Sequence, residues 1–106
     1  MAKYLVNASY TASGTQGLLK EGGTSRQKLI EDMTKKLGGS IECFYYCFGD
    51  VDVVCIVDVP DPTSAAAVSM AINSTGAVKL SMTPLLLPSD IDNATKKTVG
   101  YRPPGS

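Results

Sequence analysis

Apolar and polar residues alternate along three stretches of the chain, a pattern typical of β-strands with one buried face. These stretches are residues 2–10, 40–48 and 51–59. A fourth, residues 77–87, contains Pro84, so its later half is predicted to lie at a sheet edge, be bulged or form a separate short segment. Gly49 and Asp50 separate the second and third stretches, which therefore predict a β-hairpin.

Apolar residues between these strands recur at helical spacing. One predicted helix, with Thr24 as its N-cap, carries an apolar face made of Leu29, Ile30, Met33 and Leu37. Gly22-Gly23 separates it from a shorter helical turn expected over residues 15–20. Asp61 and Pro62 predict the N-cap and first residue of another helix. One further helical turn is expected after Pro88.

The resulting order is β-α-β-β-α-β. This order predicts a ferredoxin-like α+β fold, with a four-stranded antiparallel sheet and two helices on one of its faces. We expect residues 1–92 to form this single domain. Residues 93–106, with Pro103-Pro104-Gly105, are expected to form a C-terminal tail.

Strand alternation assigns residues to two sheet faces. The wholly apolar face, on which all three cysteines are predicted to lie, should pack beneath the helices. The other face mixes polar residues with apolar ones such as Phe44, Phe48, Val54 and Ile56. Because no helix remains to cover it, we expect two copies to pack these faces together as a dimeric α+β barrel. Polar residues of this face would then line a cavity between the sheets.

The candidate ligand-binding residues belong to this mixed face: Asn7, Ser9, Tyr46, Asp52, Lys79 and Thr83. Asp52 is the candidate catalytic base, because a partly desolvated carboxylate can accept a proton; otherwise it hydrogen-bonds backbone amides of the nearby turn. Tyr46 and Asn7 could polarise a carbonyl group, or Tyr46 packs across the dimer interface. Lys79 could neutralise Asp52 or a bound carboxylate, or be a solvated lysine that protects a sheet edge.

Charge and composition narrow the possible chemistry. Ten Lys and Arg balance ten Asp and Glu, and the 106 residues include no His. The chain therefore lacks the basic excess that nucleic-acid binding requires, and also the commonest general base and zinc ligand. We expect no nucleic-acid partner, no metal and no other cofactor.

Cysteine usage and hydropathy indicate the compartment. The odd set Cys43, Cys47 and Cys55 favours free thiols in a reducing environment. No apolar run approaches the roughly 18 residues of a membrane span. We therefore expect a cytoplasmic protein with no membrane contact.

Several segments, in order, resemble the GYD domain family: Lys3-Tyr4-Leu5-Val6, residues 17–23, residues 44–50 and Thr83-Pro84-Leu85-Leu86. Gly49 and Asp52 match the hairpin motif for which the family is named, and Val51 stands at its tyrosine position. The resemblance covers about residues 1–92 and implies the dimeric α+β barrel fold. Its superfamily includes cofactor-free monooxygenases, lactone isomerases, haem-handling enzymes and amino-acid-sensing domains, which is an analogy at the level of the fold.

We expect a small homo-oligomer that binds a small organic ligand in the sheet-face cavity, as a sensing or assembly module. The alternative is a cofactor-independent isomerase or monooxygenase, with Asp52 as base and Tyr46 and Asn7 orienting the substrate. A closed, apolar pocket in which Asp52 and Tyr46 converge would favour the enzyme, whereas a filled, dry interface would oppose it.

Overall fold

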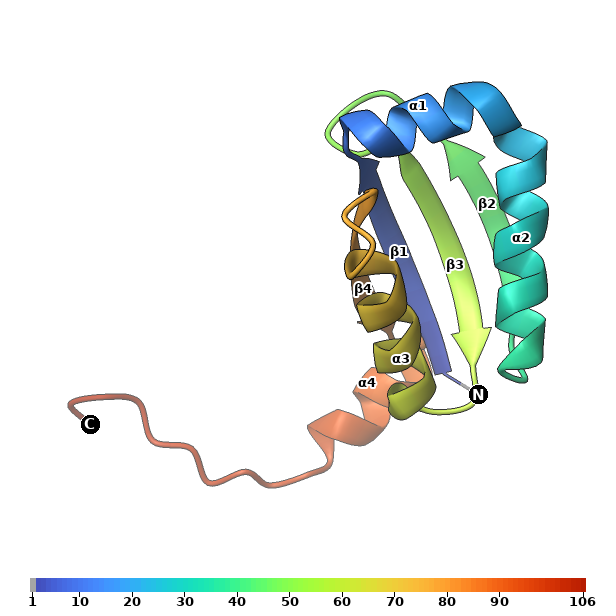
Figure 1. Cartoon of the computed structure of the whole chain (residues 1–106). Helices are drawn as coiled ribbons and strands as arrows, with labels where there is room; N and C mark the ends of the chain where they lie inside the picture. Colours follow the sequence, from blue (N-terminus) through green and yellow to red (C-terminus); the bar gives the residue numbers. More distant parts are fainter. Residues whose placement is uncertain (1) are drawn as a thin grey trace.

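A computed structural model describes residues 2–106 (Figure 1). The strands β1 (Ala2–Tyr10), β2 (Ser40–Tyr46), β3 (Val53–Val59) and β4 (Val78–Leu85) form one antiparallel sheet in the spatial order β2-β3-β1-β4. Helices α1 (Ala12–Glu21) and α2 (Gly23–Lys36) connect β1 to β2, α3 (Pro62–Asn73) connects β3 to β4, and α4 (Pro88–Thr95) follows. The predicted α+β class and ferredoxin-like order are confirmed.

The connection after β1 contains two full helices that meet at Gly22. Gly22 has φ +83°, a conformation that other residues rarely adopt, and it lets the chain change direction sharply. It also serves as the N-cap of α2, which begins at Gly23, so the prediction that Thr24 caps this helix is wrong. As a result, α1 lies across one end of the sheet and α2 runs along the side of β2 (Figure 1).

The first turn of α1 is fastened to the start of β4. The Thr11 backbone amide donates to the Ala77 carbonyl at 3.0 Å, and its hydroxyl donates to the Gly76 carbonyl at 2.9 Å. A Cβ atom added to Gly14 would lie only 2.0 Å from the Ala77 carbonyl oxygen. Only glycine therefore allows α1 to approach β4 this closely.

The core lies between the two central strands and the helices. Its buried residues on β1 and β3 are Tyr4, Val6, Ala8, Val53, Cys55, Val57 and Val59. Ala65 of α3 is buried against them, and Asp61 caps that helix by accepting a hydrogen bond from the Ser64 amide, as predicted. Side chains from α2 and α3 meet this same sheet face, which we call the helix face. The opposite face is called the open face.

A bulge in β2 corrects the predicted division between the faces. The register shifts between Ile41 and Cys43, and one extra residue reverses the alternation beyond it. Phe44 therefore pairs with Cys55, and Tyr46 with Val53, on the helix face, where the prediction had placed them on the other. Cys43 moves to the open face opposite Ile56. Phe48 lies beyond the strand, in the loop before β3, and is fully exposed.

The C-terminal segment extends away from the sheet (Figure 1). Pro84 pairs only with Tyr4 of β1 because β4 is an edge strand, which agrees with the edge placement considered for it. The expected domain end at residue 92 falls inside α4. Exposed apolar side chains continue along this segment: Leu86, Leu87, Ile91, Val99 and Tyr101. Within residues 2–106, no helix has the length and apolar character needed to cross a bilayer.

Candidate functional site

The six residues predicted to form one site lie on two different sides of the sheet. Asn7, Ser9 and Lys79 line a groove of about 220 Å³ on the open face. Thr83 lies on the same face, opposite Leu5. Tyr46 and Asp52 instead line a cleft on the helix side, and the β2 bulge is the reason that Tyr46 is found there. The predicted gathering of all six residues on one face is therefore wrong.

The helix-side cleft opens beneath α1, and we call it the α1 cleft. Its volume is about 370 Å³. Its walls come from α1, from the junction with α2, from the ends of β1 and β2 and from the loop between β2 and β3: Tyr10, Thr15, Leu18, Gly23, Tyr46, Cys47 and Asp52. Ligand-binding pockets commonly measure about 300–1,000 Å³ and have mostly apolar walls. The α1 cleft therefore has the size and lining of a small-molecule site.

Asp52 is held rigidly at one edge of the cleft. Its Oδ2 accepts a hydrogen bond from the Tyr10 backbone amide at 2.8 Å. Its own amide donates to the Ala8 carbonyl, and its carbonyl accepts from the Cys47 amide, both at 2.8 Å. These bonds extend the sheet pairing to the residue just before β3. The carboxylate thus has the backbone-bonding role that was considered for it, although its partner is the neighbouring strand β1.

Tyr46 lines the same cleft. Its hydroxyl donates to the Gly23 carbonyl at 2.9 Å, and its ring meets Phe44 edge-on at a centroid distance of 5.4 Å. Burial raises the pKa of Tyr46 to about 12; the nearby Tyr10 adds to this rise and Arg26 opposes it. The phenol therefore stays protonated at neutral pH. It can donate a hydrogen bond but does not serve as a base.

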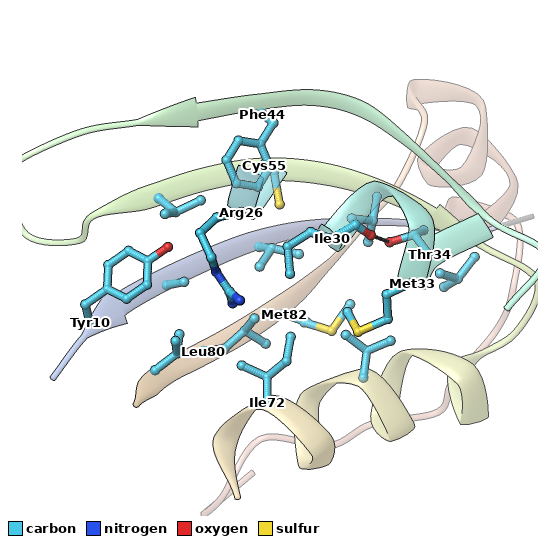
Figure 2. Close-up of a pocket in the computed structure, with 17 residues that line it drawn as sticks. Tyr10, Arg26, Ile30, Met33, Thr34, Phe44, Cys55, Ile72, Leu80 and Met82 are labelled. Atoms are coloured by element: carbon cyan, nitrogen blue, oxygen red, sulfur yellow. Dashed lines mark hydrogen bonds between the residues drawn. The ribbon is translucent and has the colours of Figure 1, made fainter. Parts of the chain in front are cut away.

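A second, smaller cavity lies between the sheet, α2 and α3, and we call it the core cavity (Figure 2). Its volume is about 60 Å³, and its walls are apolar apart from Tyr10, Arg26, Thr34 and the Cys55 thiol. The Thr34 hydroxyl is satisfied by the Ile30 carbonyl at 2.8 Å. Tyr10 lines both the core cavity and the α1 cleft.

Sequence reasoning missed Tyr10 and Arg26. Tyr10 is the last residue of the first predicted strand and shares its face with Ala8 and Val6, so alternation alone would have placed it on the helix face. Arg26 precedes Ile30 by four residues and Met33 by seven, which places it on the apolar stripe of α2. A charged residue within an apolar stripe was the feature of the sequence that could have identified Arg26 as a candidate functional residue.

The three cysteines are free thiols in different surroundings. Cys55 is buried in the sheet, and burial raises its pKa to about 11, with Cys43 contributing. Cys43 lies on the open face, and Cys47 lines the α1 cleft and donates its Sγ–H to the Val51 carbonyl at 3.2 Å. The expectation that all three belong to the core therefore holds only for Cys55. In the described part of the chain, no three His, Cys, Asp or Glu side chains are grouped so as to hold a metal ion.

The fold and these hollows define an α+β protein of ferredoxin-like topology with a ligand-sized cleft under its first helix. The chain belongs to the GYD domain family: the family model matches residues 4–95 of its 106 residues. Comparison with curated proteins and with solved structures gave no match.

Proposed function

We propose that this GYD-domain protein is a homo-oligomeric binding module that holds a small organic molecule in the α1 cleft, in a sensing or assembly role. The observation that carries the proposal is the cleft itself, about 370 Å³ in volume and mainly apolar. Tyr10, Tyr46 and Asp52 bring a small number of polar groups to these walls. A mainly apolar pocket with few convergent polar groups is the usual form of a small-molecule site.

The polar groups of the cleft are arranged for binding rather than for proton transfer. One oxygen of Asp52 is engaged by the Tyr10 amide, and the Tyr46 hydroxyl is engaged by the Gly23 carbonyl. A general base must reach the proton that it removes, and a carboxylate already bonded to backbone is less free to do so. These contacts support a non-catalytic module.

The open face supports the homo-oligomeric part of the proposal. No helix covers it in Figure 1. Half-buried Leu5, Val54 and Ile56 lie side by side at its centre, where Leu5 pairs with Ile56. Packing a second copy here would remove them from water and enclose the groove lined by Asn7, Ser9 and Lys79. Those three residues and Thr83 remain candidate ligand contacts at that interface.

One observation favours a second function, a cofactor-independent isomerase or monooxygenase. Asp52, the candidate base, and Tyr46, the candidate orienting donor, line the same cleft although they belong to different predicted strands. In this mechanism Asp52 would use its second oxygen to remove a substrate proton, and Tyr46 would donate to the resulting oxyanion. Asn7 takes no part, because it lies on the open face.

A ligand screen with a blocked-cleft variant tests the proposal. Native mass spectrometry of freshly purified protein looks for a co-purified molecule, and a thermal-shift screen covers small carboxylic acids, amides and alcohols. Leu18→Trp fills the cleft, whereas Leu19→Trp changes the adjacent residue, which is 80 % exposed. A ligand at one hundred times its Kd stabilises the folded state by about 2.7 kcal/mol.

We expect such a ligand to stabilise the wild type and Leu19→Trp but not Leu18→Trp. Equal stabilisation of all three proteins, or no hit in the screen, would refute binding in the α1 cleft. Chemical conversion of the hit, lost in Asp52→Asn while binding is kept, would establish the enzyme instead.

A further inference from the structure

Arg26 brings a positive charge into an otherwise apolar part of the molecule. It lies in the first turn of α2, and its side chain is only 27 % exposed. It lines the core cavity together with Ile30, Met33 and Met82. Figure 2 shows the guanidinium group of Arg26 reaching across this cavity. In the same view the Tyr10 hydroxyl points toward the Arg26 side chain.

The guanidinium group is poorly paired. Its nearest acid is Glu21, at 3.7 Å from Nη1 to Oε2, and the Glu21 side chain is 52 % exposed. Hydrogen bonds between arginine and a carboxylate are usually about 2.7–2.9 Å long. Within residues 2–106, no hydrogen bond involves the Arg26 guanidinium. A charge that is largely withdrawn from water and has no close partner is costly. An anion that pairs more closely with the guanidinium group would therefore replace Glu21.

Arg26 also stands beside the α1 cleft. Tyr10 and Leu18, which line that cleft, line a neighbouring hollow of about 180 Å³ together with Arg26 and Glu21. The charge of Arg26 also acts on Tyr46, whose pKa it lowers against the effect of burial. Arg26 is therefore not in the wall of the α1 cleft itself but in the adjoining hollow, which shares Tyr10 and Leu18 with the cleft, while the Asp52 carboxylate lies in the cleft wall.

We propose that the ligand is an organic acid, bound as its carboxylate by Arg26 and the Tyr10 hydroxyl, with an apolar body that lies along Leu18 in the α1 cleft. The planar fork of arginine fits a carboxylate with two parallel hydrogen bonds. Glu21 occupies Arg26 in the empty protein and gives way to the ligand. Asp52, which lines the α1 cleft, repels the acid group and so favours its placement in the hollow beside Arg26. The inference rests on the proposed function for the existence of a ligand in this cleft.

The test compares acids with their uncharged amides by isothermal titration calorimetry. The probes are phenylacetate, 4-phenylbutyrate and octanoate, each paired with its primary amide. We expect the wild type to bind at least one acid at least tenfold more tightly than the matching amide. Arg26→Gln should lose this preference while its affinity for the amide stays unchanged.

Two milder variants keep the test valid even if Arg26→Gln folds poorly. Arg26→Lys retains the charge without the planar fork and should weaken acid binding about threefold to tenfold. Glu21→Gln removes the competing carboxylate and should tighten acid binding severalfold without affecting the amide. Arg102→Gln, which changes an exposed arginine of the tail, is the control and should match the wild type.

The outcomes separate the inference from the function on which it rests. Equal affinity for acid and amide, both abolished by Leu18→Trp, would overturn the acid preference and leave a cleft that binds neutral molecules. Unchanged acid affinity in both Arg26→Lys and Glu21→Gln would also overturn it. Failure of every acid, amide and alcohol to bind the wild type would overturn the proposed function as well.

Discussion

Cys55 lies at the centre of the sheet, opposite Val6 on β1 and Phe44 on β2, and is 3 % exposed. Its pKa rises from 9.0 to about 11 because burial disfavours the thiolate, with Cys43 adding to the effect. The folded state therefore binds this proton more tightly than the unfolded chain does. Its stabilising contribution is complete below pH 9 and is lost as the pH rises to about 11.

We predict that the free energy of unfolding falls by about 2 kcal/mol between pH 9 and 11 as Cys55 ionises. Tyr46, whose pKa is about 12, acts in the same direction at the upper end of this range. Urea denaturation at pH 8, 9.5 and 10.5 measures the change. Cys55→Ala should have a flatter pH dependence, whereas Cys47→Ala should retain that of the wild type. The same slope in Cys55→Ala and the wild type would show that this thiol is not the titrating group.

The hydrogen bond between Asp52 and the Tyr10 amide should contribute to the stability of the folded state. Asp52→Ala leaves the Tyr10 amide without its 2.8 Å partner and should lower the free energy of unfolding by about 1–2 kcal/mol. Asp52→Asn keeps a side-chain acceptor and should lose less. Chemical denaturation at pH 7 compares the two. Equal losses would mean that the hydrogen bond to Tyr10 contributes little.

The sequence predicts some of the residues that line the α1 cleft but not others. Tyr46 and Asp52 were identified as polar residues of a hairpin, and they do line one cleft. Their partners Tyr10 and Gly23 come from elsewhere in the chain. Residue identities predict the available chemistry, but contacts between distant segments depend on how the elements pack.

Among the elements, helix α1 contains two glycines, Gly14 and Gly17, whose substitution should affect stability in opposite directions. Gly14→Ala would place a methyl group 2.0 Å from the Ala77 carbonyl oxygen and force α1 away from β4, so we expect a loss of about 1–3 kcal/mol. Gly17→Ala meets nothing within 4 Å inside the same helix and should gain about 0.5–1 kcal/mol from higher helix propensity. Thermal unfolding of the two variants compares them. A similar change in both would mean that the contact with Ala77 does not constrain α1.

The sequence of strand β2 predicts that the strand exists but not its register in the sheet. Its existence and approximate limits follow from its alternation and β-branched and aromatic residues. The bulge between Ile41 and Cys43 does not, because alternation in a single strand looks the same whether or not one residue is left unpaired. Pairing with β3 decides the register, and with it the face on which Phe44 and Tyr46 lie.

At the scale of the whole molecule, the open face predicts an oligomer that one substitution should dissociate. Ile56 lies near the centre of that face, between Leu5 and Cys43. We expect the wild type to be a dimer and Ile56→Lys to be a folded monomer, because a buried lysine without a partner opposes association. Met70→Lys changes an exposed side chain of α3 and is the control. Size-exclusion chromatography with light scattering measures the masses.

A monomeric wild type at micromolar concentration would refute this proposal, as would a dimer that tolerates Ile56→Lys. Truncation after Thr95 examines the extended tail, which carries exposed Val99 and Tyr101. If the open face forms the interface, the truncated chain remains a dimer. Dissociation on truncation would assign the interface to the tail instead.

The sequence by itself determined the fold class, since hydrophobic periodicity reports local structure and the order of strands and helices that it gives agrees with the global fold. Alternation specifies the strands and Asp61-Pro62 the start of α3, whereas Pro84 left an edge strand, a bulge or a separate segment open until the strand order placed β4 at the edge. Tertiary structure decided the sheet register, the sides of the sheet on which the candidate residues lie, and the meeting of Tyr10, Arg26 and Tyr46 under α1. Those three residues are far apart in the chain. Strand pairing in the sheet and the turn at Gly22 bring them together, because contacts between distant segments depend on packing rather than on local propensity.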